Sequence, residues 1–296
     1  MTQNSQQPAR TAYSAMGYGR SDYEACYAYS TEWGLNGLHC HDFYEIYIHY
    51  RGAKFYCMDN QVYPLTSCDM MIIPPFRLHG LIGDHVTQDY ERCFLYISPA
   101  MLKSCSAGLM DLDHFFRQHS QNGQYHFHLR DEEGQQCKDL IAGLMQTQSG
   151  TSAMERFSSF TKLVQFLNIV CEVMNRSDKA TEPIVVNEAM QDVLAYINEH
   201  YTTPVKLDTI ARQFGVSVSF LSHEFVKYTG RSVYDYVLYR RVLLAKELIT
   251  SGRPLNEVAY HCGFNDYSSF LRSFTKMTGQ SPSAYRKGQP APTSLL

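Results

Sequence analysis

The sequence predicts an α+β protein of two domains, an N-terminal β-barrel with a helical segment and a C-terminal domain made only of helices. Three observations indicate this: short apolar runs before residue 100, helical spacing after residue 131, and an internal repeat after residue 207. A chain of 296 residues is long for one domain and comfortable for two. We expect an arm at 1–19, a barrel at 20–130, a helical segment at 131–176, a linker at 177–186, a helical domain at 187–288 and a tail at 289–296.

The barrel is predicted from runs such as YEIYIHY, CDMMIIPP and RCFLYIS, which are separated by turn residues. Short β-branched and aromatic runs at near-regular intervals favour an all-β barrel or sandwich. No run approaches eighteen apolar residues, so no membrane span is expected, and the start MTQNSQQPAR lacks the apolar stretch of a signal peptide. The nine cysteines form no CxxC pair, which indicates reduced thiols and a cytoplasmic protein.

Two helices are expected between the barrel and the linker. Apolar residues share one face of the first helix, namely Leu140, Ile141, Leu144 and Met145. The second helix, roughly Ser152 to Asn175, carries a stripe of Met154, Phe157, Phe160, Val164, Leu167, Cys171 and Met174. This stripe would either join two chains into a homodimer through residues 152–175 or pack back onto the barrel, and the sequence leaves both open.

The C-terminal third repeats itself. LDTIARQFGVSVSFLSHEFVKYTGRS (207–232) and LNEVAYHCGFNDYSSFLRSFTKMTGQS (255–281) match at nine positions in the same order, including Ala211 with Ala259 and Gly215 with Gly263. Each copy predicts a short helix, a tight turn and a second helix. The alanines let the two helices cross closely, and the glycines supply the positive φ that the turn needs.

The second helix of each copy is expected to begin at a capping side chain, Ser217 in one copy and Asn265 or Asp266 in the other. Its outward positions hold short polar and cationic residues, which suit a helix lying in a major groove. Between the copies, SVYDYVLYRRVLLAKELI (232–249) predicts a stiff helix about 27 Å long at 1.5 Å per residue. It would hold two reading helices about one DNA turn, ~34 Å, apart.

The charge distribution agrees with a nucleic-acid partner. Residues 204–287 hold 12 Lys and Arg against 6 Asp and Glu, whereas the rest of the chain holds 14 against 23. A basic helical domain on an acidic body favours a polyanion partner for that domain alone. A helical bundle that binds another protein is the plainer alternative.

Residues 187–287 resemble the DNA-binding domain of the AraC/XylS family of bacterial transcription regulators. ARQFGVSVSFLSHEFVKYTGRS and AYHCGFNDYSSFLRSFTKMTGQSPSAYR carry the pattern, which ends in P-x-x-Y-R at 282–286. The resemblance implies a DNA-binding regulator and not an enzyme, with promoter or operator half-sites and RNA polymerase as partners. It leaves open whether the protein activates or represses.

The same resemblance implies roles for the outward residues. The expected base-facing residues are Ser219, Ser222 and His223 in one groove and Tyr267, Ser268, Ser269 and Arg272 in the next. Arg272 would take guanine O6 and N7 with both arms of its guanidinium. The expected phosphate contacts are Lys227, Arg240, Lys276 and Arg286.

LHCHDFYEIYIHYRG (38–52) resembles the first motif of the cupins, as His39-x-His41 followed by Glu45 and Gly52. In one strand the two histidines and the glutamate are even numbers apart, so their side chains would point the same way, into the barrel. The second motif is PPFRLH (74–79), which ends in His79. It has Phe76 where metal cupins usually carry glycine and no asparagine four residues after the histidine.

Two interpretations of this site remain open. In one, His39, His41, Glu45 and His79 hold zinc, manganese, iron or nickel, and the protein is a metal-dependent isomerase or dioxygenase with an accessory helical domain. In the other, no metal cofactor is expected and the barrel binds a small-molecule effector. Fusion to a DNA reader favours the second, because a sensor needs only a difference in affinity between two states.

The candidate effector-binding residues are His39, His41, Glu45, His79, Trp33, Tyr47 and Arg77. The last three would add the aromatic faces and donors that a sugar favours. We expect bound effector to alter how residues 1–20, or the linker around 176–183, hold the DNA-binding domain.

Overall fold

The computed structural model divides into two compact units, one ending at Ile184 and one beginning at Val185. The residues that it describes are 22–34, 38–39, 41, 43–58, 61–82, 86–147, 152–176, 182–184, 188–229 and 231–288. The expected arm at 1–19, the tail at 289–296 and most of the linker at 177–186 lie outside these residues.

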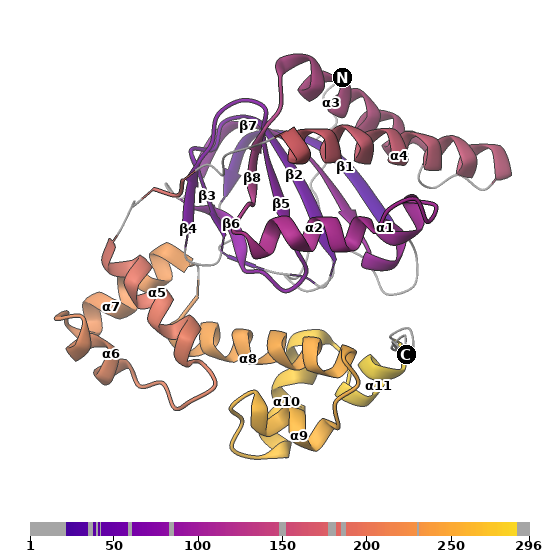
Figure 1. Cartoon of the computed structure of the whole chain (residues 1–296). Helices are drawn as coiled ribbons and strands as arrows, with labels where there is room; N and C mark the ends of the chain where they lie inside the picture. Colours follow the sequence, from indigo (N-terminus) through magenta and orange to yellow (C-terminus); the bar gives the residue numbers. More distant parts are fainter. Residues whose placement is uncertain are drawn as a thin grey trace. The chain divides into compact units, whose positions relative to one another are not determined.

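The first unit is built on two antiparallel sheets (Figure 1). The five-stranded sheet has the order β1 (Tyr23–Gly34), β7 (Val86–Ile97), β2 (Tyr44–Arg51), β5 (Asp69–Ile73) and β8 (His126–His128). The three-stranded sheet has the order β4 (Gln61–Pro64), β3 (Phe55–Met58) and β6 (His79–Ile82). The predicted barrel-like fold of short strands is confirmed.

The two faces of the five-stranded sheet differ because side chains alternate along each strand. On β2, Ile46 and Ile48 join a large apolar cluster under the helices. Tyr47 between them joins a second cluster that contains residues of both sheets and is rich in tyrosine, with Tyr56, Tyr63, Tyr90 and Tyr125. The space between the sheets is therefore the more polar of the two interiors.

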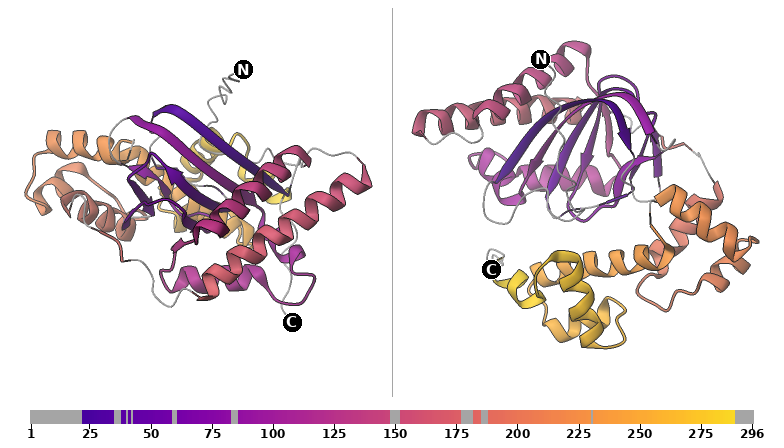
Figure 2. Two further views of the ribbon diagram at one scale, coloured as in Figure 1. Left: turned by 90° about the horizontal axis from the view of Figure 1, so that it is seen from above. Right: turned by 180° about the vertical axis from the view of Figure 1, so that it is seen from behind.

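Four helices contribute buried residues to the cluster on the outer face of the five-stranded sheet (Figure 2). They are α1 (Pro99–Cys105), α2 (Leu112–Gln121), α3 (Asp131–Thr147) and α4 (Ala153–Arg176). The sequence predicted α3 and α4 but placed only strands before residue 130, so α1 and α2 correct that expectation. They are short and bury only two or three side chains each, too few to show a period. Their capping residues, Ser98 and Asp111, were the available signal.

The helix α4 carries two different apolar surfaces. Its buried face includes Leu163, Phe166 and Val170, whereas Met154 and Phe157 are 75% and 67% exposed. This exposed end lies beyond the edge of the sheet in Figure 1. The single stripe predicted from the sequence is wrong, because its steps of three and four residues wind roughly 160° around a helix of 3.6 residues per turn.

The second unit is helical throughout the residues that the structure describes, and the expected repeat is present. The first helix-turn-helix is α6 (Leu207–Gln213) with α7 (Val218–Thr229), and the second is α9 (Leu255–His261) with α10 (Tyr267–Thr278). The remaining helices are α5 (Glu188–His200), α8 (Val233–Thr250) and α11 (Pro282–Lys287). The caps are as predicted: Ser217 accepts from the Phe220 amide and Asp266 from the Ser269 amide.

The helix α8 connects the two repeats. Near its start, Tyr236 packs edge-on against the buried Phe225 of α7, with ring centres 5.4 Å apart. Further along, Val242, Ala245 and Ile249 join the core of the second repeat, together with Val258, Phe270 and Phe274. An 18-residue helix anchored at both ends in this way acts as a stiff connector of about 27 Å.

None of the helices in the described ranges combines the length and the apolar character that a membrane crossing requires.

The two turn glycines occupy equivalent places but different surroundings, which gives a matched test. Gly215 and Gly263 have φ of +66° and +82°. A Cβ at Gly215 would meet no atom within 4 Å, whereas at Gly263 it would lie 2.2 Å from the Thr202 carbonyl oxygen. We predict that Gly215→Ala costs about 1–2 kcal/mol from the positive φ alone, and that Gly263→Ala costs at least about 3 kcal/mol because strain and overlap add. Chemical unfolding followed by helical circular dichroism measures both, and equal losses would contradict the close approach at Gly263.

Candidate effector site and nucleic-acid interface

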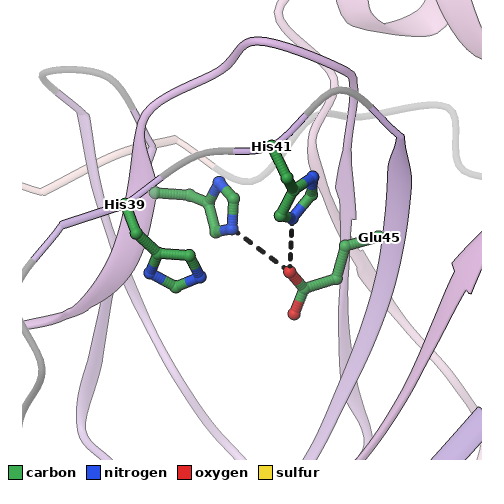
Figure 3. A group of neighbouring side chains, drawn as sticks. His39, His41 and Glu45 are labelled. Carbon is green, nitrogen blue, oxygen red and sulfur yellow. Dashed lines mark hydrogen bonds and ion pairs between the residues drawn. The ribbon is translucent and has the colours of Figure 1, made fainter. Parts of the chain in front are cut away.

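Three histidines and one glutamate converge inside the first unit. His39, His41, Glu45 and His79 each offer one ligand atom, and these atoms all lie within 4.8 Å of one another (Figure 3). The prediction that one strand would carry the first three is wrong, because β2 begins only at Tyr44. Instead, His39 forms an isolated bridge with His79 on β6, and the amide of each donates to the other's carbonyl oxygen at 2.9 and 2.8 Å.

The hydrogen bonds of this group fix the orientation of two imidazoles. The Nε2 atoms of His41 and His79 lie 2.9 and 3.1 Å from the same oxygen, Oε2 of Glu45. Their Nδ1 atoms lie 2.9 Å from the Phe43 carbonyl oxygen and 2.8 Å from that of Arg77. A carbonyl oxygen only accepts, so each Nδ1 carries a hydrogen and donates it.

Burial and the neighbouring charges shift the pKa values of His41 and Glu45 in opposite directions. Burial lowers the pKa of His41, although the Glu45 carboxylate opposes this. Burial raises the pKa of Glu45, but the hydrogen bonds of His41 and His79 outweigh it and hold that pKa well below its usual range. Glu45 is therefore ionised at neutral pH, while the loss of hydration disfavours the charged form of His41.

The second motif forms a turn with a left-handed residue at its centre. Phe76, which replaces the usual glycine, has φ of +65°, a conformation that glycine adopts most easily. Its amide donates to the His41 carbonyl oxygen at 2.7 Å, and this bond ties the turn to the first motif. The turn therefore holds a non-glycine residue in the left-handed region.

Of the other predicted effector residues, Tyr47 and Trp33 lie at the interior and the Arg77 side chain is exposed. Arg77 contributes its carbonyl oxygen to His79 instead. The Tyr47 hydroxyl lies 3.0 Å from that of Tyr90 and 3.3 Å from Nδ1 of His49. The interior between the sheets therefore presents phenol and imidazole groups next to the His–Glu group.

Sequence reasoning missed a buried cation in this interior. Arg92 is 5% exposed, and its guanidinium carbon lies 4.2 Å from the Trp33 ring centre and 4.1 Å from that of Tyr90. Among the described residues it makes no ion pair, and its Nη1 has no hydrogen-bond partner. Buried Asp69, by contrast, lies within 3.2 Å of two histidines. The sequence feature that could have revealed Arg92 is its position in RCFLYIS, two residues before Phe94. Residues two apart on a strand face the same side, so an inward Phe94 implies an inward Arg92.

The outward positions of the two reading helices are placed as the repeat predicted. Exposed on α7 and α10 are Ser219, His223, Lys227, Tyr267, Ser268, Arg272 and Lys276, and half-buried are Ser222 and Ser269. Arg240 on α8 is half-buried with its guanidinium 5.2 Å from the Tyr201 ring centre. The base and phosphate contacts of these residues stay predictions.

One of these residues already has partners within the domain. The Ser269 hydroxyl donates to Asp266 at 2.8 Å and accepts from Nη2 of Arg272 at 3.2 Å. Because Asp266 also caps α10, Ser269 is suited to hold the guanidinium in place. Arg272 is exposed, so the guanidinium is accessible to a base edge.

Comparison with known proteins identifies the family. An AraC-like ligand binding domain model matches residues 23–160, and a helix-turn-helix domain model matches residues 210–288. The chain belongs to the AraC family of transcription regulators. As a member, it is a DNA-binding regulator with an effector-binding domain and is not an enzyme.

Relatives within the family match along most of the chain. The HTH-type transcriptional activator RhaS of Salmonella schwarzengrund (strain CVM19633) is 27% identical over 257 residues, which are 86% of this chain and 88% of that protein. RhaS of Escherichia coli O81 (strain ED1a) is 27% identical over 255 residues, 85% and 87% of the two chains. Among solved structures, the DNA-binding domain of AdpA in complex with a target DNA is 30% identical over 33% of this chain and 90% of that one, with a TM-score of 0.32.

Proposed function

We propose that this regulator reads two successive major grooves of a DNA duplex as a homodimer, and that a sugar-like effector bound between its two sheets changes this binding. The observation that carries the DNA part is the duplicated helix-turn-helix joined by the stiff helix α8. A connector of about 27 Å is close to the ~34 Å that separates successive major grooves. We also propose cytoplasmic action and a contact with RNA polymerase, which the transcriptional role requires.

We assign base contacts and phosphate contacts to different residues according to their side-chain chemistry. Arg272, held by Ser269, would pair with guanine, since its planar fork matches two acceptors on that base. Lys276 lies four residues further along the exposed face of α10, where an ammonium suits a phosphate. Lys227 occupies the equivalent place on α7.

We predict that Arg272→Ala costs roughly 1–3 kcal/mol at its cognate base and relaxes sequence preference there. Lys276→Ala, the matched change, should weaken binding to all sequences alike. It should also reduce the slope of log binding constant against log salt concentration by about one. Titrations of both variants on matched and mismatched duplexes at several salt concentrations separate the two roles. If Arg272→Ala weakened every duplex equally, Arg272 would be a phosphate contact.

Homodimer formation is supported by the exposed end of α4. Met154, Phe157 and Phe160 are large apolar side chains in contact with solvent on one stretch of helix. The remainder of α4 is already packed on the sheet, so this stretch presents apolar surface on a fixed support. A second copy of the same helix would cover it with matching chemistry.

We expect the wild-type chain to be a dimer in solution and Phe157→Asp to be a monomer, because a carboxylate would be buried at the contact. Gln165→Asp adds the same charge at an exposed position two turns along α4 and should stay dimeric. Sedimentation analysis of the three chains decides this. A dimeric Phe157→Asp chain would place the interface elsewhere.

The effector proposal rests on Arg92, a buried cation that pairs with no carboxylate among the described residues. A buried charge without a partner costs several kcal/mol, and an anionic group on a ligand would remove that cost. The Trp33 and Tyr90 rings and the Tyr47 hydroxyl add the flat faces and hydroxyl partners that suit a sugar ring. We therefore propose a sugar acid as the effector.

A hydrogen bond at the end of the first unit could carry the effect of a bound effector to the chain that leads into the second unit. The Ile184 amide donates to the Val62 carbonyl oxygen of β4 at 2.7 Å. The next residue of β4, Tyr63, belongs to the interior cluster between the sheets. A ligand that displaces β4 would therefore move the point at which the chain leaves the first unit.

The only tryptophan of the chain reports on this site, since Trp33 lies against Arg92. We expect sugar acids such as glucuronate to change its fluorescence, neutral glucose to have no effect, and Arg92→Gln to abolish the response. Arg51→Gln, an exposed arginine on β2, is the control and should respond normally. A response to neutral sugars alone, or one that survives in Arg92→Gln, would exclude the anionic effector.

A further inference from the structure

We propose that Arg241, at the middle of α8, sets the angle between the two reading helices α7 and α10. It does so by holding the turn that precedes the first helix-turn-helix against the turn inside the second. The inference deepens the proposed function, because it rests on the reading of two grooves by α7 and α10. It assigns Arg241 a positioning role and no contact with DNA.

The helix α8 fixes the separation of the two repeats, but their relative orientation is a second quantity that has to be set. In Figure 1, α5, α6 and α7 lie at one end of α8, and α9 and α10 lie at the other. A long helix curves along its length, and any bending or twisting of α8 turns one reading helix relative to the other. A contact that joins the two repeats beside α8 opposes this motion.

The turn at 201–203 makes such a contact and is anchored to the first repeat. It follows α5, which ends at His200, and leads into α6. The ring of Tyr196 on α5 packs edge-on against the ring of Phe214 at the end of α6, with 5.9 Å between the ring centres. The helices on both sides of the turn are therefore packed together as one part of the first repeat.

The same turn meets the second helix-turn-helix at Gly263, in the turn between α9 and α10. A Cβ built on Gly263 would lie 2.2 Å from the carbonyl oxygen of Thr202 and 2.8 Å from its Cα. Glycine, which has no Cβ, allows the two backbones to approach this closely. Because Gly263 comes shortly before Tyr267, the first residue of α10, the contact acts next to the start of the second reading helix.

Arg241 fastens the turn in this place with two hydrogen bonds. Its Nε donates to the Tyr201 carbonyl oxygen at 2.6 Å, and its Nη2 donates to the Thr203 carbonyl oxygen at 2.8 Å. These acceptors come directly after the C-terminus of α5, where carbonyl groups lack partners within the helix and attract a cation. The guanidinium carbon also lies 5.9 Å from the ring centre of Phe264, which belongs to the core of the second repeat.

This arrangement needs the shape of an arginine side chain as well as its charge. A guanidinium is planar and directs separate N–H groups at two acceptors, whereas lysine carries one compact ammonium on a flexible stem. Both bonds are charge-assisted, and Arg241 is half-buried between the turn and the second repeat. Arg241→Lys therefore keeps the positive charge that favours DNA and removes the two-point hold on the turn.

The test titrates the full chain on duplexes that carry both recognition blocks, one block alone, or both blocks with an extra base pair between them. The insertion should weaken wild-type binding, because it moves one block along and around the duplex. We expect Arg241→Lys to bind the two-block duplex on the order of tenfold more weakly, a typical coupling between two sites. It should also tolerate the insertion better and bind each one-block duplex as the wild type does. Arg253→Lys, the same change at an exposed arginine after α8, is the control and should match the wild type throughout.

A second measurement needs no DNA. Spin labels at the exposed residues Val226 on α7 and Thr275 on α10, attached through non-natural side chains because the chain has nine cysteines, report the distance between the reading helices. Double electron–electron resonance should give one narrow distribution for the wild type and a broader one for Arg241→Lys. An equally narrow distribution in the variant, or an equal loss of affinity for one-block and two-block duplexes, would overturn the positioning role. Wild-type binding without sequence preference would count against the proposed function, whereas a broadened variant would still support the role of Arg241.

Discussion

The alternation of side chains along β2 is the constraint on which the first unit depends. Ile46 and Ile48 face the helices, whereas Glu45, Tyr47 and His49 alternate with them and face the other way. A slip of one residue in the pairing with β5 or β7 would exchange the two sets and bury the carboxylate under the helices. The same pairing that forms the apolar core therefore aims the polar groups into the interior, and neither can change alone.

The second unit differs, because the turn and capping contacts that define each helix-turn-helix join residues that are close in the sequence. The turn glycines, the capping side chains and the inward phenylalanines all lie within one repeat. For this reason the sequence predicted both helix-turn-helix motifs and the connecting helix almost to the residue. The interior of the first unit depends on pairings such as His39 with His79, which spacing along the chain does not reveal. The sequence identified the four converging residues through a motif, but the strand invoked to explain their convergence is not present.

The remaining errors have related physical causes. The helices α1 and α2 were missed because each buries too few side chains to create a period. On α4, the apolar residues wind from an exposed end to a buried one, so one predicted stripe proved to be two surfaces. Arg92 was overlooked because a lone arginine in an apolar strand is a weak signal until its neighbours are known. Only the assembled sheets show that it is buried between two rings and that its Nη1 has no hydrogen-bond partner among the described residues.

The central claim is that two reading helices held by one stiff connector give this regulator its sequence preference. Selection of bound duplexes from a random pool by the full chain measures this directly. The structure predicts enriched sequences with two short conserved blocks about 10 base pairs apart, centre to centre. Binding without sequence preference, or enrichment of only one block, would contradict it.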